Sequence, residues 1–232
     1  MAALFVTATG TDLGKTYVAA QLVRHLRARG RRVRALKPVV SGFTLAGAAQ
    51  SDPGVLLAAL GVALDAAALD AIAPWRYTAP LAPTLAAQAE GTSVPFDALV
   101  RFCRDAIAAA ARDRAEVVIE GVGGVMVPLD ARHTVLDWIA ALGIPTLLVA
   151  GSYLGAISHT LTALAALRTH SAPLAAVLVD ETPGGVTLDA TCAEIARFAP
   201  DVDVIGIARG ADADRWSAAC DRILDGSRPR VR

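Results

Sequence analysis

A glycine-rich turn near the start of the chain constrains the fold more than any other feature. Residues 10–16 read Gly-Thr-Asp-Leu-Gly-Lys-Thr, and they follow an apolar, strand-like run at residues 4–7. A strand that leads into a glycine loop and then a helix points backbone N–H groups and the positive end of the helix dipole at one anion. In such a loop Lys15, as a surface cation, would reach the terminal phosphates of a nucleoside triphosphate, and the Thr16 hydroxyl would bind Mg²⁺. We therefore predict a phosphate loop, defined here as residues 9–16, between the first strand and the first helix.

The match to the phosphate-loop pattern is partial, because the complete pattern has a glycine at the position of Thr9. The alternative is a glycine-rich turn between a strand and a helix that carries an unrelated lysine. We favour the phosphate loop because strand, loop and helix follow one another in the required order.

Short apolar or β-branched runs alternate with alanine- and leucine-rich helical stretches along the chain. We expect strands at residues 4–7, 33–36, 117–119, 145–150, 174–179 and 203–207, and the clearest helices at 15–29, 97–114, 156–169, 187–198 and 211–223. Continuous apolar strands are typical of a parallel sheet covered on both faces. The pattern predicts an α/β fold: a doubly wound, mostly parallel sheet with helices on both faces, like the three-layer sandwich of P-loop NTPases. Residues 1–225 are expected to form one domain, and residues 226–232 a disordered basic tail.

The composition limits the partners of the chain. Its 232 residues include 22 basic and 22 acidic ones, so no overall charge favours nucleic acid. No apolar run approaches the ~20 residues of a membrane-spanning helix, and the early first strand leaves no room for a signal peptide. Cys103, Cys192 and Cys220 are far apart and fall in expected helices, which is typical of unpaired thiols in a reducing compartment. We therefore expect a cytoplasmic enzyme without a nucleic-acid or membrane partner.

Three further groups lie where an α/β sheet binds its ligands, near the carboxyl ends of strands. Lys37 follows the second expected strand, and Glu120 ends another strand just before a glycine turn at residues 121–124. A second cation could stabilise phosphoryl charge, and a carboxylate there could hold Mg²⁺ directly or through water. Asp52 lies in a helix-start signal and could supply another carboxylate near the metal. The alternatives are a solvated lysine, a strand followed by a flexible turn, and an aspartate that caps a helix.

Together these motifs resemble those of the dethiobiotin synthetase family, ATP-dependent enzymes that close a ring in biotin biosynthesis. The blocks that carry the resemblance are residues 9–16, Lys-Pro-Val-Val-Ser-Gly at 37–42, Ser-Asp at 51–52, residues 77–83, Glu-Gly-Val-Gly-Gly at 120–124 with Pro-Leu at 128–129, and Leu-Gly-Ala-Ile-Ser-His at 154–159. They stand in the family's order and spacing as far as about residue 182. The blocks at 37–42 and 120–124 are together more specific than a phosphate loop, which many unrelated proteins share.

The resemblance implies a cyclo-ligase that acts on 7,8-diaminononanoate, CO₂ and ATP, with Mg²⁺ as cofactor. One amine captures CO₂ as a carbamate, ATP phosphorylates the carbamate, and the second amine displaces phosphate to close a cyclic urea. A carbamate that attacks a phosphate brings two anions together, so cations must stand between them. The resemblance gives this catalytic role to Lys15 and Lys37.

The resemblance also assigns site residues, position by position. The metal ligands would be Thr16, Asp52 and Glu120. The nucleotide would be bound by Asp12, Leu13, Gly14, Lys15, Thr16, Tyr17, Asp52, Glu120, Gly121, Val122 and Gly123. The substrate would contact Thr11, Lys37, Ser41 and Ser158. Members of the family are homodimers whose partner subunit helps to bind the substrate's carboxylate, a role that would fall near Ser158 and the helix expected to start around Pro83.

The chain departs from the family pattern where the nucleotide base would bind. Residues 179–182 read Val-Asp-Glu-Thr in place of a segment with asparagine, and residues 206–210 read Gly-Ile-Ala-Arg-Gly in place of a proline-rich turn. Ser158 also stands where the family has asparagine. The sequence therefore leaves the preferred base and the details of substrate binding open.

Two functions from other classes are also considered. A partition or positioning ATPase, which is a nucleotide-driven dimer switch, usually has a second lysine at the position of Gly10. A nucleotide-binding module without chemistry would not need Lys37 or the glycine turn at 121–124. Formation of dethiobiotin from the diamine, bicarbonate and ATP would distinguish the enzyme from both.

Overall fold

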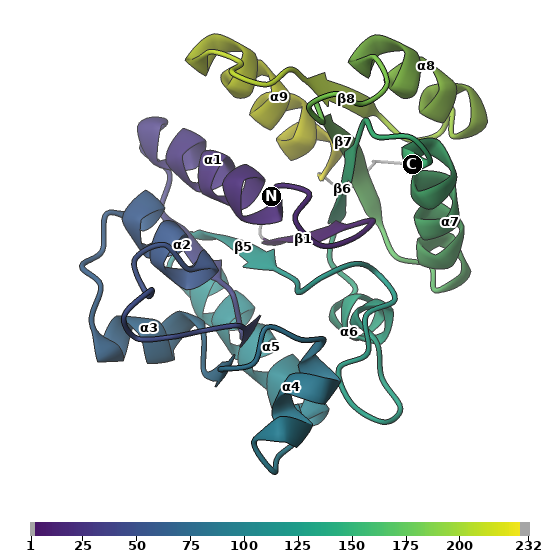
Figure 1. Cartoon of the computed structure of the whole chain (residues 1–232). Helices are drawn as coiled ribbons and strands as arrows, with labels where there is room; N and C mark the ends of the chain where they lie inside the picture. Colours follow the sequence, from purple (N-terminus) through teal and green to yellow (C-terminus); the bar gives the residue numbers. More distant parts are fainter. Residues whose placement is uncertain (1–2, 228–232) are drawn as a thin grey trace.

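The computed structural model describes residues 3–227 and has a central sheet between two layers of helices (Figure 1). In chain order its elements are β1 Ala3–Ala8, α1 Lys15–Ala28, β2 Val33–Leu36, β3 Val39–Ser41, α2 Asp52–Leu60, α3 Ala66–Ile72, β4 Trp75–Tyr77, α4 Pro83–Ala89, α5 Phe96–Arg112, β5 Glu116–Glu120, α6 Val135–Leu142, β6 Thr146–Gly151, α7 Ala156–Thr169, β7 Leu174–Asp180, α8 Leu188–Phe198, β8 Val204–Ile207 and α9 Ala213–Gly226. The described part of the chain has no helix that is both long and apolar enough to span a membrane.

Six parallel strands form the main sheet, in the order β2-β5-β1-β6-β7-β8. The first strand lies inside the sheet: Val6 is opposite Glu120 of β5, and Ala8 is opposite Val149 of β6. The chain passes from β1 to the edge strand β2, later inserts β5 between them, and adds β6, β7 and β8 in turn on the other side of β1. In such a sheet a crevice opens at the carboxyl ends of the strands, at the point where the strand order reverses.

The core of the sheet explains why its strands read as continuous apolar runs. Every residue of β1 and β5 is buried, so neither strand has a polar solvent-facing side. Phe5 of β1 contacts Trp138 of α6 edge to face, with ring centroids 4.8 Å apart, and both side chains are fully buried. Helices α1, α2 and α9 cover one face of the sheet, and α5 to α8 cover the other (Figure 1). The predicted doubly wound α/β fold is thus confirmed.

All six predicted strands and five predicted helices are present, with ends within three residues of those expected. Residues 41–96, where the sequence analysis placed no strand or clear helix, contain three short helices and part of a second sheet. In that sheet β3 and β4 pair in parallel, with Val39 opposite Trp75. Helix α6 was not predicted, although Thr134 and Asp137 form a reciprocal capping box at its start.

The end of the described chain differs from the predicted tail. Helix α9 extends through Gly226, and Ser227 is buried, so these two residues belong to the folded chain. Residues 228–232 lie outside the described residues. The three cysteines are unpaired, and burial raises the pKa of Cys103 and Cys220 to about 12, which keeps both thiols protonated and unreactive.

Gly54, in the first turn of α2, offers a test of this packing. A Cβ atom at Gly54 would lie 2.0 Å from the backbone oxygen of Ala48. Because that backbone cannot move as a side chain can, Gly54→Ala should lower the free energy of unfolding by roughly 1–3 kcal/mol. Gly47→Ala is the matched control, because the nearest atom to its Cβ would be the side-chain Oγ1 of Thr44, at 3.1 Å, and the nearest backbone atom would be 4.0 Å away. Urea denaturation of both variants measures the difference, and a Gly54→Ala chain as stable as the control would contradict the expectation.

Candidate active site

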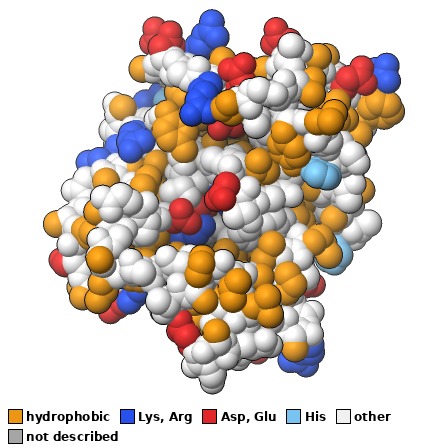
Figure 2. All heavy atoms as spheres, viewed as in Figure 1, with side chains coloured by type: hydrophobic (Ala, Val, Ile, Leu, Met, Phe, Trp, Pro, Cys, Tyr) orange, Lys and Arg blue, Asp and Glu red, His pale blue; other side chains and the backbone are white. Residues whose placement is uncertain are grey.

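A cavity of about 1020 Å³ opens beside the phosphate loop at the carboxyl ends of the strands. The start of α2, the segment 80–83 and the turn after β5 complete its wall. Figure 2 shows acidic and basic side chains side by side in a hollow on this face, with hydrophobic side chains around it. Of the predicted site residues, the cavity is lined by Thr11, Asp12, Leu13, Gly14, Lys15, Thr16, Tyr17, Lys37, Ser41, Asp52, Glu120, Val122 and Gly123.

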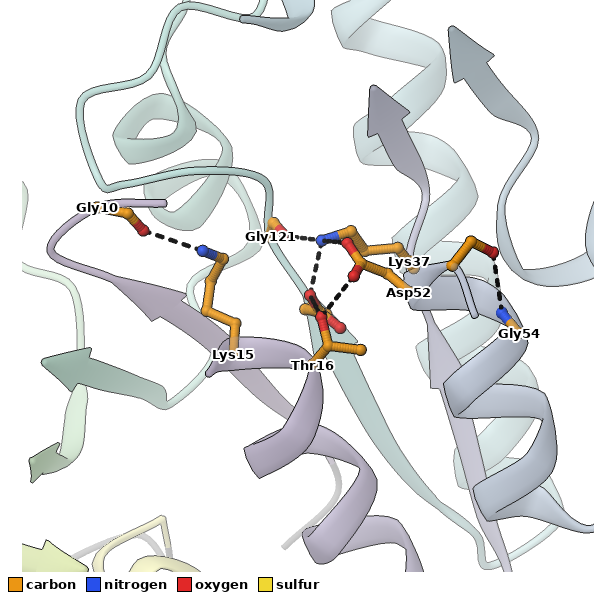
Figure 3. A network of polar contacts seen from close by, with 9 residues as sticks. Gly10, Lys15, Thr16, Lys37, Asp52, Gly54 and Gly121 are labelled. Carbon is orange, nitrogen blue, oxygen red and sulfur yellow. Dashed lines mark hydrogen bonds and ion pairs between the residues drawn. The ribbon is translucent and has the colours of Figure 1, made fainter. Parts of the chain in front are cut away.

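The Thr16 hydroxyl lies between two carboxylates from distant parts of the chain. Its Oγ1 is 2.8 Å from Asp52 Oδ1 and 2.7 Å from Glu120 Oε1. Thr16 belongs to the first turn of α1, Asp52 begins α2, and Glu120 ends β5. The fold therefore brings together the three side chains that the sequence suggested as metal ligands. Figure 3 labels two of them, Thr16 and Asp52.

Lys37 is buried beside the two carboxylates, with 2% of its surface exposed. Its Nζ is 2.6 Å from Glu120 Oε1, 2.8 Å from Asp52 Oδ2 and 2.7 Å from the carbonyl oxygen of Gly121. These three acceptors occupy all three donors of the ammonium group. Burial alone would lower the pKa of Lys37, but the attraction of Glu120 and Asp52 outweighs it and holds the pKa above its ordinary value. The alternative of a solvated strand-end lysine is therefore wrong.

Ser51, and not Asp52, caps helix α2. Its side chain accepts a hydrogen bond from the backbone N–H of Gly54 at 3.4 Å. The carboxylate of Asp52 points instead toward Thr16 and Lys37 (Figure 3). Burial raises the pKa of Asp52, but the charge of Lys37 more than offsets it and keeps the pKa below its usual range. Asp52 is therefore an ionised carboxylate at neutral pH, and the helix-cap alternative is wrong.

Lys15 is more enclosed than expected. We predicted a surface cation, but only 6% of its surface is exposed, because the glycine loop folds around its side chain. Its Nζ donates a hydrogen bond to the carbonyl oxygen of Gly10 at 3.0 Å (Figure 3). Burial, and then repulsion by Lys37, lower the pKa of Lys15 to about 8. The side chain is thus a cation at neutral pH that is close to losing its proton.

Two glycines shape the loop around this lysine. Gly14 has φ +83° at the start of α1, a left-handed conformation that L side chains rarely adopt. A Cβ atom at Gly124 would lie 3.2 Å from the backbone of Gly10. The turn after β5 therefore packs directly on the phosphate loop, which holds Glu120 and Lys15 at one site.

The oxygen atoms around Thr16 suit a magnesium ion. Mg²⁺ prefers oxygen ligands and is usually held by one or two carboxylates together with water and substrate phosphates. The Oε2 atom of Glu120 is buried without a hydrogen-bond partner within residues 3–227, a state that is unfavourable unless a cation or water meets it. Thr16, Asp52 and Glu120 could therefore hold Mg²⁺ beside a bound phosphate.

A second cavity, of about 430 Å³, lies on the other side of the phosphate loop. Asp12, Leu13, Gly14 and Tyr17 line both cavities. The rest of its wall comes from the last residues of β6, β7 and β8, from the loops after β7 and β8, and from Trp216 of α9. One elongated ligand with phosphates in the first cavity could thus place its other end in the second.

Some predicted residues lie outside the first cavity, and some cavity residues were not predicted. Ser158 is exposed in α7 and is not among the residues that line either cavity. Gly121 contributes its carbonyl oxygen to Lys37. No motif pointed to Gln50 or Val127, which line the first cavity, whereas the segments 179–182 and 206–210, which contribute to the second cavity, were expected to lie near the nucleotide base.

Comparisons with known proteins agree on the fold and on a family. Residues 2–207 match a family model described as an AAA domain. The chain is 53% identical to an ATP-dependent dethiobiotin synthetase BioD of Methylobacterium nodulans, over 90% of this chain and 94% of that protein. It is 49% identical to a protein of the same description from a Caulobacter species, over 100% of this chain and 98% of that protein.

Among solved structures, the chain resembles the signal recognition particle receptor FtsY of Elizabethkingia anophelis, with a TM-score of 0.54. The match covers 96% of this chain but 65% of the receptor, so the chain spans slightly less than two thirds of that protein's length. At 14% identity, this likeness concerns the fold alone.

The lowered pKa of Lys15 predicts a proton linkage in nucleotide binding. Phosphates favour the charged ammonium, but above a pH of about 8 the free protein holds Lys15 neutral. Binding should then take up one proton, and the affinity should fall as pH rises, by up to about tenfold per pH unit. Calorimetry between pH 7 and 9.5, in buffers of different ionisation enthalpy, measures both effects.

Lys15→Arg is the control for this linkage, because a guanidinium stays charged over the whole range. The variant should bind nucleotide without the proton uptake. Equal affinity of the wild-type protein at pH 7 and 9.5, with no proton taken up, would contradict the assignment.

Proposed function

The chain belongs to the ATP-dependent dethiobiotin synthetase family, and we propose from this premise how its residues form dethiobiotin. The substrates are 7,8-diaminononanoate, CO₂ and ATP, and the products are dethiobiotin, ADP and phosphate. The observation that carries the proposal is the convergence of Lys15, Thr16, Lys37, Asp52 and Glu120 on one cavity. Those five side chains supply the cations and the oxygen ligands that phosphoryl transfer needs.

The nucleotide lies across the phosphate loop. Its triphosphate binds to the backbone N–H groups of the loop and to the start of α1, whose dipole favours an anion. Lys15 exchanges its hydrogen bond with Gly10 for one with the terminal phosphates. The nucleoside end occupies the second cavity, which shares four loop residues with the first.

The metal site consists of Thr16, Asp52 and Glu120. Bound there, Mg²⁺ would neutralise phosphate oxygens as negative charge shifts to the leaving group. Lys37 holds both carboxylates in place through its contacts with Asp52 and Glu120. Its buried charge also lies beside the reacting groups, where little water screens it.

The diamine occupies the part of the cavity near Ser41 and the segment 80–83. Leu81 and Val127 offer apolar surface to its hydrocarbon chain. The Ser41 Oγ is buried without a hydrogen-bond partner in the described chain, so it is available to the carbamate or an amine. Thr11 lines the same cavity from the phosphate loop.

In the reaction, a carbamate oxygen attacks the γ-phosphorus of ATP and the bond to ADP breaks. The second amine then attacks the carbonyl carbon of the resulting mixed anhydride, the ring closes, and phosphate leaves. Lys15 and Lys37 reduce the repulsion between the two anions during the first step. Preorganised cations of this kind act mainly in the transition state.

The enzyme acts as a homodimer in this proposal, with Ser158 near the substrate's carboxylate in the partner's site. Ser158 lies on the first turn of α7 and is exposed, and Leu154 just before this helix is 90% exposed. In such a dimer Leu154 would add an apolar contact to the subunit interface beside Ser158. The three unpaired cysteines are typical of a reducing cytoplasm, where we place the enzyme.

Direct product analysis tests the function. The purified protein is incubated with 7,8-diaminononanoate, bicarbonate, Mg²⁺ and ATP, and dethiobiotin is measured by mass spectrometry. The wild-type protein should form dethiobiotin, and Lys15→Ala should lose turnover by a factor of at least ~10². ATP hydrolysis that does not depend on the diamine, without product, would favour a nucleotide switch and refute the proposal.

A substitution of Lys37 distinguishes a catalytic role of this residue from a purely structural one. Lys37→Gln leaves two carboxylates without their buried cation, so it should lower the free energy of unfolding by about 3–5 kcal/mol and lower kcat by ~10²–10³. The kcat of Lys37→Gln is measured at a temperature well below the unfolding midpoint of the variant, so that loss of folded protein does not contribute. A kcat close to that of the wild-type protein under these conditions would show that Lys37 only supports the fold.

A further inference from the structure

A hairpin beside the first cavity is held in place by side chains that the proposed reaction does not use. Residues 127–135 lead from the glycine turn after β5 into α6 and fold back on themselves. The backbone N–H of Val135 donates to the carbonyl oxygen of Val127 at 2.9 Å. Further along, the N–H of Leu129 donates to the carbonyl oxygen of His133 at 2.8 Å. Val127 lines the first cavity, and His133 lies in the turn at the other end of the hairpin.

Asp130 and His133 fix this turn. Nδ1 of His133 lies 3.0 Å from Asp130 Oδ1 and 2.9 Å from Asp130 Oδ2. Asp130 Oδ1 also accepts hydrogen bonds from the backbone N–H groups of Arg132 and His133, at 2.7 Å and 2.8 Å. Burial raises the pKa of Asp130, but these hydrogen bonds more than offset it and keep the pKa below its usual range. The carboxylate is therefore ionised and can only accept, so Nδ1 of His133 carries a proton and donates it.

The ring of His133 also ties the hairpin to α5. It stacks on Phe96, the first residue of this helix, with ring centroids 3.9 Å apart and an angle of 6° between the ring planes. Both rings border an open cavity of about 550 Å³ whose wall includes Asp97 and Arg101 of α5. Since 29% of the His133 side chain is exposed, its removal creates no enclosed void, and the expected loss of stability is small.

The other end of the hairpin forms part of the cavity wall. Val127 lies over Gly123, since a Cβ atom at Gly123 would be 2.6 Å from Val127 Cγ2. Thr84, in the first turn of α4, donates a hydrogen bond from its Oγ1 to the carbonyl oxygen of Pro128 at 2.8 Å. Pro83, just before Thr84, lines the cavity together with Val127. A displacement of the hairpin would therefore move two parts of the wall, Val127 and the start of α4.

We propose that His133 is a positioning residue for the diamine: it holds the hairpin, and the hairpin holds Val127 against the hydrocarbon chain. The inference rests on the proposed function, which puts this hydrocarbon chain beside Leu81 and Val127. Apolar contacts remote from the reacting atoms are equally strong in the ground state and in the transition state. Loss of such a contact raises KM and leaves kcat unchanged.

His133→Ala removes both the hydrogen bond to Asp130 and the stacking on Phe96. The KM for 7,8-diaminononanoate should rise about three- to tenfold. The kcat and the dissociation constant of Mg²⁺–ATP should stay within about twofold of the wild-type values, because neither depends on the hydrocarbon chain. Steady-state kinetics of dethiobiotin formation at saturating ATP, and calorimetry of nucleotide binding, measure these quantities.

Two conservative substitutions separate the two contacts. His133→Asn places an amide N–H near the position of Nδ1, which keeps a donor to Asp130 but removes the stacking. His133→Phe keeps a ring on Phe96 but removes the donor. Each variant should rescue part of the KM defect of His133→Ala. If both had a KM as high as that of His133→Ala, neither contact would account for the effect, and the inference would be overturned.

His25→Ala is the matched control for a merely structural role. His25 also contacts an aspartate, with its Nε2 3.0 Å from Asp221 Oδ1, but neither residue lines the two cavities beside the phosphate loop. This variant should lose stability in urea denaturation and keep the wild-type KM for the diamine. A wild-type KM in His133→Ala would overturn the inference, as would an equal rise of KM in His25→Ala.

Hydrogen exchange tests the hairpin without the reaction. The N–H of Val127 donates to the carbonyl oxygen of Gly124, and the N–H of Val135 donates to that of Val127. In His133→Ala both amide protons should exchange about three- to tenfold faster than in the wild-type protein. The N–H of Val125, which donates to the carbonyl oxygen of Ala8 at 3.1 Å, is the internal control and should keep its rate.

The two measurements separate this inference from the proposed function. A wild-type protein that forms no dethiobiotin refutes the function, and hydrogen exchange then decides the inference alone. Faster exchange at Val127 and Val135, with Val125 unchanged, supports a hairpin held by His133. Unchanged exchange at Val127 overturns the inference whether or not dethiobiotin is formed.

Discussion

A buried ammonium group determines where distant parts of this chain meet. Lys37 has its three donors on Glu120, Asp52 and the carbonyl oxygen of Gly121, at 2.6–2.8 Å. A lysine charge in the interior of a protein is strongly unfavourable without such partners. The end of β2, the start of α2 and the end of β5 are therefore held at one point, and Thr16 of α1 lies against the same carboxylates. The ion pairs of Lys37 with Glu120 and Asp52 therefore stabilise this part of the fold and also hold the two carboxylates at the site.

The parts of the fold that could be predicted are those with strong local signals. The buried strands β1, β5, β6 and β7 read as apolar runs because helices cover both faces of the sheet, and the long helices between them have clear periodicity. The short elements between residues 41 and 96 have weaker signals, because helices of seven to nine residues are stabilised mainly by contacts with the rest of the protein. The presence and the bounds of these short helices could not be derived from the local sequence pattern alone.

For the site, the sequence identified the side chains but not their environments. Thr16, Asp52 and Glu120 were chosen from three separate motifs, and the fold brings their oxygen atoms together. The enclosure of Lys15 was missed because it depends on a loop that folds back over its own side chain. The segments 179–182 and 206–210 were expected to lie near the nucleotide base, but the hydrogen bond that joins them, from the backbone of Arg209 to Glu181 28 positions earlier, could not be predicted. Environments of this kind depend on contacts between segments, and no local motif encodes them.

Because β1 lies inside the sheet, the phosphate loop that follows it separates two groups of functional residues, one on each side of β1. Strands β2 and β5 and the start of α2 carry the groups proposed for chemistry, whereas the loops after β7 and β8 surround the cavity proposed for the base. The two sets of residues share the phosphate loop and little else, so substitutions in one half leave the contacts of the other in place. Loops 181–183 and 208–210 can therefore vary under natural selection while the catalytic half stays constant. Such a molecule can adapt to the nucleotide pool of its cell and still perform the same reaction.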